Sequence, residues 1–324
     1  MSRQRQTITA KLMLSCVGLV IASLVAGAVA FAAAPRTFTE TRHRGSIEAV
    51  FSYRSKVPFG YEGQRLLVRR AGRPSLEAQL PADSSWPSPP GHSLALVDLD
   101  GGESEVLLSL YTGGANCCFT WRVYRFAGGR YRGRLFNSGN AGLRLVNLDR
   151  RGTPEIRSGD GRFHYLFSSG AESFYPLRIY RFKAGRLVTI TRQFPYHVRQ
   201  AEIRSWRLAA RFWNSDRNPH TVLAAWAANK YLLGEGADVW PRIQRLIDEG
   251  TIESHVEANG PPYPSALRAA LRRFGYLAYA SHVHQHLSPP ARESQTPNPC
   301  RCRSFPREGT RPRPTRFRRP MPRP

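Results

Sequence analysis

Two stretches of this sequence repeat one pattern, and that repeat constrains the fold more than any other feature. The stretches VYRFAGGRYRG (123–133) and IYRFKAGRLVT (179–189) share Tyr-Arg-Phe and then, after two further residues, Gly-Arg. Alternating residues on both sides of a glycine turn are typical of a β-hairpin. The two stretches are offset by 56 residues. A period of about 50 residues with several strands in each unit is typical of propeller blades or stacked β units.

Further short β patterns extend this organisation over residues 36–196. Apolar runs at 94–97 and 143–146 each lead into an acidic loop, and another β pattern follows each loop. We expect 163–169 to be a strand of the second unit and 36–80 to supply a third, degenerate unit. A closed propeller typically takes about four to eight blades. The predicted fold class is therefore mainly β, with degenerate propeller-like or stacked β-hairpin repeats.

The sequence pattern becomes helical after residue 196. Asn218 and Pro219 are typical of a helix start, and they precede an apolar-periodic segment that runs to residue 236. Similar patterns follow at 237–250 and 263–278, whereas 201–213 fits either a strand or a short helix. Residues 197–280 are thus predicted to form a small, mostly helical module whose apolar face packs on the β repeats. The Arg- and Pro-rich tail at 281–324 is predicted to be disordered.

The amino terminus has the pattern of a targeting segment. Three basic residues precede an apolar run from 12 to 32, and Ala30-Phe31-Ala32 fits a small-x-small cleavage site. The run is also long enough to span a bilayer. Residues 1–32 are therefore either a cleaved signal peptide or a transmembrane helix that anchors the chain in a membrane. Both alternatives place the rest of the protein outside the cytoplasm, either secreted or membrane-anchored.

The first acidic loop is DLDGGESEV (98–106), with candidate cation ligands Asp98, Asp100, Glu103 and Glu105. Calcium loops present oxygen ligands at alternate positions, with glycine where the chain turns sharply. The loop is one residue short of a full-length D-x-D-G-D-G-x-x-[DE] pattern. It is therefore predicted either to bind calcium or to survive as an ordinary turn.

The second acidic loop is NLDRRGTPE (147–155), with Asn147, Asp149 and Glu155 as its candidate ligands. Its length is complete, but Arg150 and Arg151 occupy the usual Gly and Asp positions. Two arginines inside a loop oppose a dication. Calcium is therefore less favoured here than in the first loop.

These two loops, lying between predicted strands, resemble the FG-GAP/VCBS repeats of exported bacterial proteins and integrin-type propellers. The resemblance covers about 100 residues, 94–194. It implies a propeller-like β fold and calcium bound in the loops. It does not imply one activity, because one fold serves many functions.

The adjacent Cys117 and Cys118 are the other local feature of the first repeat. Cysteines in an oxidising compartment tend to be paired. The pattern leaves three alternatives open: a vicinal disulfide between the two, bridges to Cys300 and Cys302 in the tail, or free and intermolecular thiols.

The formal charge of +25 has two interpretations. It indicates a partner rich in phosphates or carboxylates, or it reflects a GC-rich coding sequence, since only four of the 48 basic residues are lysine. The chain carries no nucleophile elbow, P-loop, H-E-x-x-H or dinucleotide fingerprint, and no specific nucleic-acid motif. We therefore expect a noncatalytic binding or scaffold module of the cell envelope or the extracellular space. The alternatives are an envelope hydrolase with the 98–105 loop in its site, and an arginine-driven binder of anionic polymers.

Overall fold

The structure is a computed structural model that describes residues 34–277, apart from 57–58, 82–85, 115–116 and 216. The predicted signal or anchor segment (1–32) and the predicted disordered tail (281–324) lie outside the described residues. Within the described part of the chain, none of the helices combines the length and the apolar character that crossing a membrane requires.

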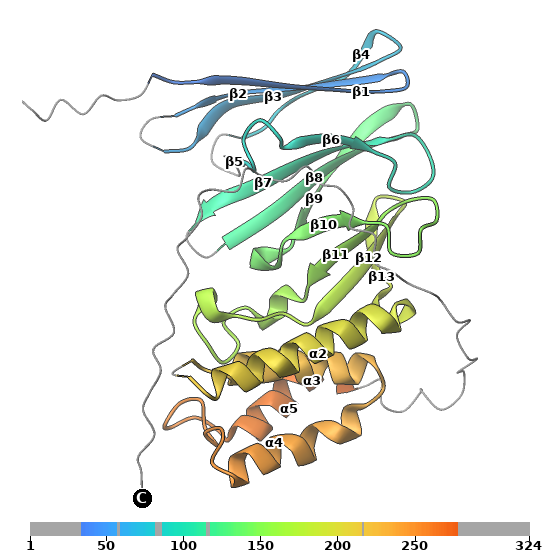
Figure 1. The fold of residues 1–324 in the computed structure, drawn as a ribbon. Coiled ribbons are helices and arrows are strands. Elements are labelled where there is room, and N and C mark those ends of the chain that lie inside the picture. Colours follow the sequence, from blue (N-terminus) through green and yellow to red (C-terminus); the bar gives the residue numbers. More distant parts are fainter. Residues whose placement is uncertain (1–33, 57–58, 82–85, 115–116, 216, 278–324) are drawn as a thin grey trace, which may run out of the picture. The chain divides into compact units, whose positions relative to one another are not determined.

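The described strands form three antiparallel sheets, which can be followed in Figure 1. Sheet A holds β1 (Thr37–Arg44), β2 (Ile47–Ser55), β3 (Tyr61–Arg70) and β4 (Arg73–Gln79). Sheet B holds β5 (Trp86–Pro87), β6 (Leu94–Val97), β7 (Glu105–Gly114), β8 (Cys117–Ala127) and β9 (Arg130–Asn137). Sheet C holds β10 (Leu143–Val146), β11 (Glu155–Gly159), β12 (Leu177–Lys183) and β13 (Arg186–Thr189).

Sheets A and C are meanders in which strands pair in sequence order. Sheet B departs from this plan at one edge, because β5 and β6 do not pair with each other and both pair with β7. Among the described residues of the proline-rich segment 81–93, the strand β5 takes up only Trp86 and Pro87, as expected for residues that lack ladder donors. The predicted mainly β fold with repeated hairpin units is thus confirmed, and residues 36–80 do form a further unit.

Apolar side chains join the sheets into continuous cores. One cluster combines residues of sheets A and B, among them Phe51, Leu66 and Leu108. Another combines residues of sheets B and C, among them Trp121 and Ile156. Alternating burial along β2 places every second side chain in the first of these cores, which is the pattern of a strand with one buried face.

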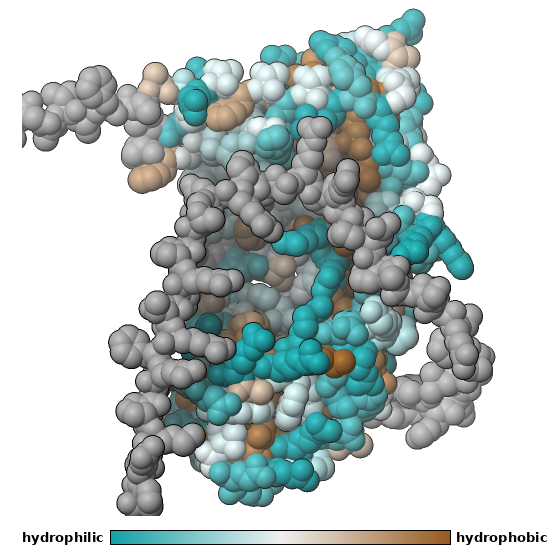
Figure 2. All heavy atoms as spheres, in the orientation of Figure 1, coloured by the Kyte–Doolittle hydropathy of each residue, from teal (hydrophilic) through white to brown (hydrophobic). Residues whose placement is uncertain are grey.

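The helical module consists of four α-helices and packs on sheet C. Its helices are α2 (Pro195–Phe212), α3 (His220–Leu232), α4 (Val239–Asp248) and α5 (Tyr263–Arg273). Every residue of α3 is buried, so α3 is the central helix rather than the one-sided helix that its sequence suggested. Leu177 and Ile179 of sheet C belong to the same apolar cluster as α3, which confirms the predicted packing of helices on strands. On the face shown in Figure 2, hydrophilic side chains cover most of the helical module.

One local prediction that was left open is resolved, and another is wrong. Residues 201–212 are helical, because they continue α2, which begins at Pro195, and Trp213 is the C-cap. Residues 163–169 are not a strand. The second strand of the unit, β11, ends at Gly159, and the chain then enters the 3-10 turn Gly161–Phe163. Tyr165 and Phe167 have φ values of 59° and 66°, which a strand does not allow. The remaining 3-10 turns are Gly139–Ala141, Gly170–Glu172, Thr191–Gln193 and Gly236–Asp238.

A buried carboxylate ties the end of the helical module to sheet C. Asp160 is 5% exposed and accepts hydrogen bonds from Arg162, Arg178 and the hydroxyl of Tyr276. Burial would raise its pKa, but the hydrogen bonds and charges of the two arginines outweigh burial and lower it to about 2. This cluster therefore remains ionic at neutral pH.

Candidate functional site

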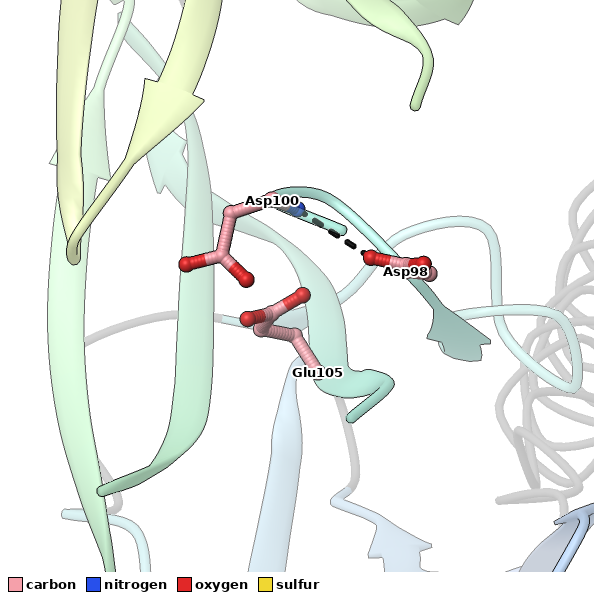
Figure 3. A group of neighbouring side chains, drawn as sticks. All are labelled: Asp98, Asp100 and Glu105. Carbon is pink, nitrogen blue, oxygen red and sulfur yellow. Dashed lines mark hydrogen bonds between the residues drawn. The ribbon is translucent and has the colours of Figure 1, made fainter. Parts of the chain in front are cut away.

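The first acidic loop connects β6 to β7 and is a tight turn held by its own side chains. Asp98 Oδ1 accepts hydrogen bonds from the backbone N–H of Asp100 (3.2 Å) and of Gly101 (2.7 Å), which is an Asx-type turn. Gly101 has φ +84°, a conformation that favours glycine. Figure 3 shows the carboxylates of Asp100 and Glu105 turned toward each other, with Asp98 bonded to the backbone of Asp100.

Glu105 is the first residue of β7 and is fully buried. Its Oε2 accepts a hydrogen bond from the backbone N–H of Leu99 at 2.8 Å, whereas its Oε1 is buried without a hydrogen-bond partner. Burial raises the pKa of Glu105 to about 7; the bond from Leu99 opposes this shift, and the neighbouring charge of Asp100 adds to it. A buried carboxylate oxygen without a donor is the kind of atom that a bound cation would satisfy.

The structure brings together three of the four predicted ligands of this loop. Asp98, Asp100 and Glu105 each offer a carboxylate oxygen, and these oxygens lie within 4.8 Å of one another. Glu103 lies apart from them and pairs with Arg70 of sheet A, whose Nη2 is 2.8 Å from Glu103 Oε2. Glu103 thus links two sheets, which the linear spacing of the acids did not indicate.

An arginine from the neighbouring hairpin approaches the same carboxylates. Arg125 of β8 places Nε 2.7 Å from Asp100 Oδ2 and 3.6 Å from Glu105 Oε1. One positive charge therefore faces three carboxylates, and the group keeps a negative balance. All-oxygen, negatively charged ligand sets suit calcium, so the first loop fits that ion.

The second acidic loop connects β10 to β11 and shares the glutamate bond of the first loop, whereas its Asx-type turn is closed by a different position. Glu155 is buried, and its Oε2 accepts from the backbone N–H of Leu148 at 2.8 Å, as Glu105 does from Leu99. Asp149 Oδ1 accepts from the N–H of Arg151 at 2.9 Å, again closing an Asx-type turn.

The cation of the second loop is an arginine. Arg181 Nη2 lies 2.8 Å from Glu155 Oε1 and 3.2 Å from Asp149 Oδ2, so both oxygens of Glu155 are bonded. Arg150 takes the turn position of Gly101 with φ +57°. The remaining candidate, Asn147, is exposed in this loop. The arrangement leaves Glu155 no oxygen for a dication.

Sequence reasoning missed the two arginines. Arg125 and Arg181 are the arginines of the two Tyr-Arg-Phe triplets that revealed the repeat. In sheet B the triplet lies on β8, and its arginine bonds an acid of the β6–β7 loop. In sheet C the triplet lies on β12, and its arginine bonds acids of the β10–β11 loop. The repeated triplet could therefore have indicated these ion pairs, because each repeat contains both an acidic loop and the arginine that pairs with it.

The predicted cysteine pair lies where β7 turns into β8. Cys118 is buried and disulfide-bonded, and its backbone N–H donates to Thr112 Oγ1 at 2.6 Å. The side chain of Cys117 lies outside the described residues, so the pairing of Cys117 with Cys118 stays a prediction.

Comparison with known proteins found a matching family model and similar proteins in two organisms. The family model of the sll0997 C-terminal domain matches residues 199–275, which include most of the helical module. The probable thylakoid lumen protein sll0997 of Synechocystis sp. is 29% identical over 257 residues, covering 72% of this chain and 74% of that protein. The uncharacterized protein y4bJ of Sinorhizobium fredii is 27% identical over 233 residues, which are 65% of this chain and 36% of that protein. No solved structure matches.

These relatives bear on location more than on chemistry. Similarity to a lumenal protein supports an extracytoplasmic location, as the amino-terminal segment predicted. The matched family model does not reach the acidic loops, which lie before residue 199. By sequence, the helical part of this chain is similar to the C-terminal domain of sll0997, and most of the chain is similar to that probable thylakoid lumen protein.

Proposed function

We propose that the protein is a noncatalytic binding or scaffold module that works outside the cytoplasm, with a calcium ion stabilising its first acidic loop. The observation that carries the proposal is the setting of the acids. They lie in turns between strands, bonded to backbone amides and arginines. The cavities around sheet C and the helices, of 260 to 610 Å³, are lined by other residues. Such acids suit a structural role better than substrate turnover.

Calcium in the first loop is supported by the buried Glu105 Oε1, which lacks a hydrogen-bond partner beside two further carboxylates. Asp98, Asp100 and Glu105 would hold the ion, and the ion would offset their mutual repulsion. The FG-GAP/VCBS resemblance belongs to the same proposal, because those repeats carry their ligands on the connection between strands. The second loop would remain free of calcium, since Arg181 already provides the positive charge there.

A thermal melt of the purified protein in EDTA, and then in millimolar calcium, tests the calcium part. A ligand that binds only the folded state raises the melting temperature with its concentration. We expect a rise of several degrees with calcium, little with magnesium, and none in Asp100→Asn. The matched control is Asp149→Asn in the second loop, which should keep the full calcium response. Equal responses in both variants, or none in the unmodified protein, would contradict a site at the first loop.

One observation favours a second function. A carboxyl with a pKa of about 7 beside another carboxylate is a feature of acid–base catalysis, and Glu105 has both. An envelope hydrolase is therefore the alternative. Turnover of cell-wall polymers that disappears in Glu105→Gln would support the hydrolase and overturn the noncatalytic proposal. Absence of turnover together with an intact calcium response would support the binding module.

A further inference from the structure

Three arginines converge on one cavity between sheet C and α2, and the cavity contains no acid. Its volume is about 610 Å³, within the range of small-molecule sites. Arg144 of β10 and Arg157 of β11 are direct cross-strand partners, and Arg204 of α2 lines the cavity with them. Like charges placed directly opposite in a sheet are destabilising, so this arrangement needs an explanation.

The half-buried Arg157 differs from three arginines that lie beside the buried acids of sheets B and C. Arg125, Arg178 and Arg181 each have a carboxylate partner within 3.2 Å. Within the described chain, by contrast, Arg157 forms neither an ion pair nor a hydrogen bond through its side chain, and the same is true of Arg144 and Arg204. Burial lowers the pKa of Arg157, and the charges of Arg204 and Arg144 lower it further. Arg157 is thus a half-buried positive charge with two exposed arginines, Arg144 and Arg204, beside it and no acid in the cavity.

Apart from Ser158 and Ser205, the rest of the cavity lining has no polar side chain other than the Tyr175 hydroxyl. Its lining includes the buried Leu177 and Ala201, together with Phe174, Tyr175 and Leu208. A ligand that fits therefore combines an anionic group for the arginines with an apolar or ring-bearing body for the remaining wall. A phosphate monoester carries close to two negative charges and three strong acceptor oxygens, which matches three guanidinium groups better than one carboxylate does.

We propose that Arg144, Arg157 and Arg204 form a binding site for a small organic phosphate. The site rests on the proposed binding role and names a ligand class for it. The negative charge of the ligand would relieve the repulsion among the arginines, and its organic part would lie against the aromatic side chains.

Calorimetric titration of the full protein with phenyl phosphate tests the site, with inorganic phosphate, phenol and long-chain polyphosphate as comparison probes. We expect phenyl phosphate to bind more tightly than inorganic phosphate or phenol. Arg157→Gln and Arg204→Gln should each weaken binding roughly ten- to a hundredfold, as expected for the loss of a hydrogen bond to a charged group. The matched control is Arg207→Gln, because Arg207 is exposed on the same helix and lies outside the cavity.

A second measurement separates a binding role from a structural one. Without ligand, Arg157→Gln should melt at the same temperature as the unmodified protein or higher, because it removes a repelled charge. With phenyl phosphate, only the unmodified protein and Arg207→Gln should gain stability. A large loss of stability in Arg157→Gln with phenyl phosphate binding retained would overturn the proposal.

Two other results would also overturn it. Equal weakening by Arg207→Gln, or preference for polyphosphate, would replace the site with diffuse binding of an anionic polymer. Failure of phenyl phosphate to bind would remove this ligand class. The calcium response of the first loop would remain measurable in all these cases, so failure of the phosphate site and failure of the proposed function are distinguishable.

Discussion

The two acidic loops share a backbone plan and differ in how their carboxylates are neutralised. In both loops, the strand that follows begins with a buried glutamate, which accepts a hydrogen bond from a backbone N–H of the loop at 2.8 Å. In the second loop Arg181 bonds the other oxygen of Glu155 at 2.8 Å. In the first, Arg125 bonds Asp100 and stays 3.6 Å from Glu105. A difference of under 1 Å in one contact thus separates a closed ion pair from an open site.

This comparison teaches that a repeated turn can keep its shape while its counter-ion changes. A guanidinium from β8 or β12 offers directed hydrogen bonds, whereas calcium needs six to eight oxygen ligands. In the second loop, the guanidinium of Arg181 neutralises the carboxylates. The first loop combines one arginine with Glu105, whose Oε1 accepts no hydrogen bond, so we expect this loop to respond to both calcium and pH.

The largest expected effect is the pH dependence contributed by Glu105. Its pKa is about 7 in the folded protein against an ordinary value of 4.5. The folded state therefore binds the extra proton between these values, and stability falls as pH rises from 4.5 to 7, by up to about 3 kcal/mol. Glu105→Gln should remove this fall, as measured by urea unfolding at several pH values.

The quantity to compare is the difference between the two proteins at each pH. Burial lowers the pKa of His220 and gives an opposing trend in both of them. The matched variant of the second loop, Glu155→Gln, should instead lose stability at neutral pH, because it breaks the pair with Arg181. Parallel pH curves for Glu105→Gln and the unmodified protein would contradict the distinction between the loops.

Removal of the two arginines should also separate the loops. Breaking a buried pair costs about 3–5 kcal/mol, but the side chain of Arg181 is 37% exposed. We therefore expect Arg181→Met to cost about 2 kcal/mol and Arg125→Met about 1 kcal/mol in denaturant unfolding. Millimolar calcium should offset the cost of Arg125→Met and leave that of Arg181→Met. Equal costs with equal calcium responses would mean that the two loops are equivalent.

The smallest expected effect concerns the backbone of the first turn. Gly101 has φ +84° and open space where a β-carbon would lie, so Gly101→Ala should cost about 1 kcal/mol through backbone strain alone. Gly102 lies outside the left-handed region and serves as the control, with an expected change within about 0.5 kcal/mol. Similar losses at both positions, measured by thermal unfolding, would contradict the importance of this turn.

Much of the fold was predictable because it follows local periodicity. Alternation and the glycine turns located both Tyr-Arg-Phe hairpins, and Asn218 and Pro219 marked the region where α3 begins. The segment 163–169 was mispredicted because its apolar residues pack from turns rather than from a strand. Propensity alone cannot register that Asp160 caps a turn there with its side chain.

The candidate site was predictable only in part. The spacing of the acids located Asp98, Asp100 and Glu105, since these ligands are local in sequence. The pairing of Glu103 with Arg70 spans 33 residues, and the pairing of Arg181 with Glu155 spans 26. No sequence pattern predicts a pairing between residues that are this far apart along the chain. In the cavity, Arg204 joins the cross-strand pair Arg144 and Arg157 only because α2 packs on sheet C.

The central position of α3 has a consequence for how much of the chain must fold together. The match to the sll0997 C-terminal domain begins at residue 199, inside α2, whereas the apolar cluster around α3 also takes in Leu177 and Ile179 of sheet C. The hydrogen bond from Tyr276 to Asp160 also joins two residues that lie outside the matched segment, one on each side of it. The segment that the family model matches is therefore shorter than the packed unit, and helices expressed without sheet C would expose the apolar surface that Leu177 and Ile179 cover.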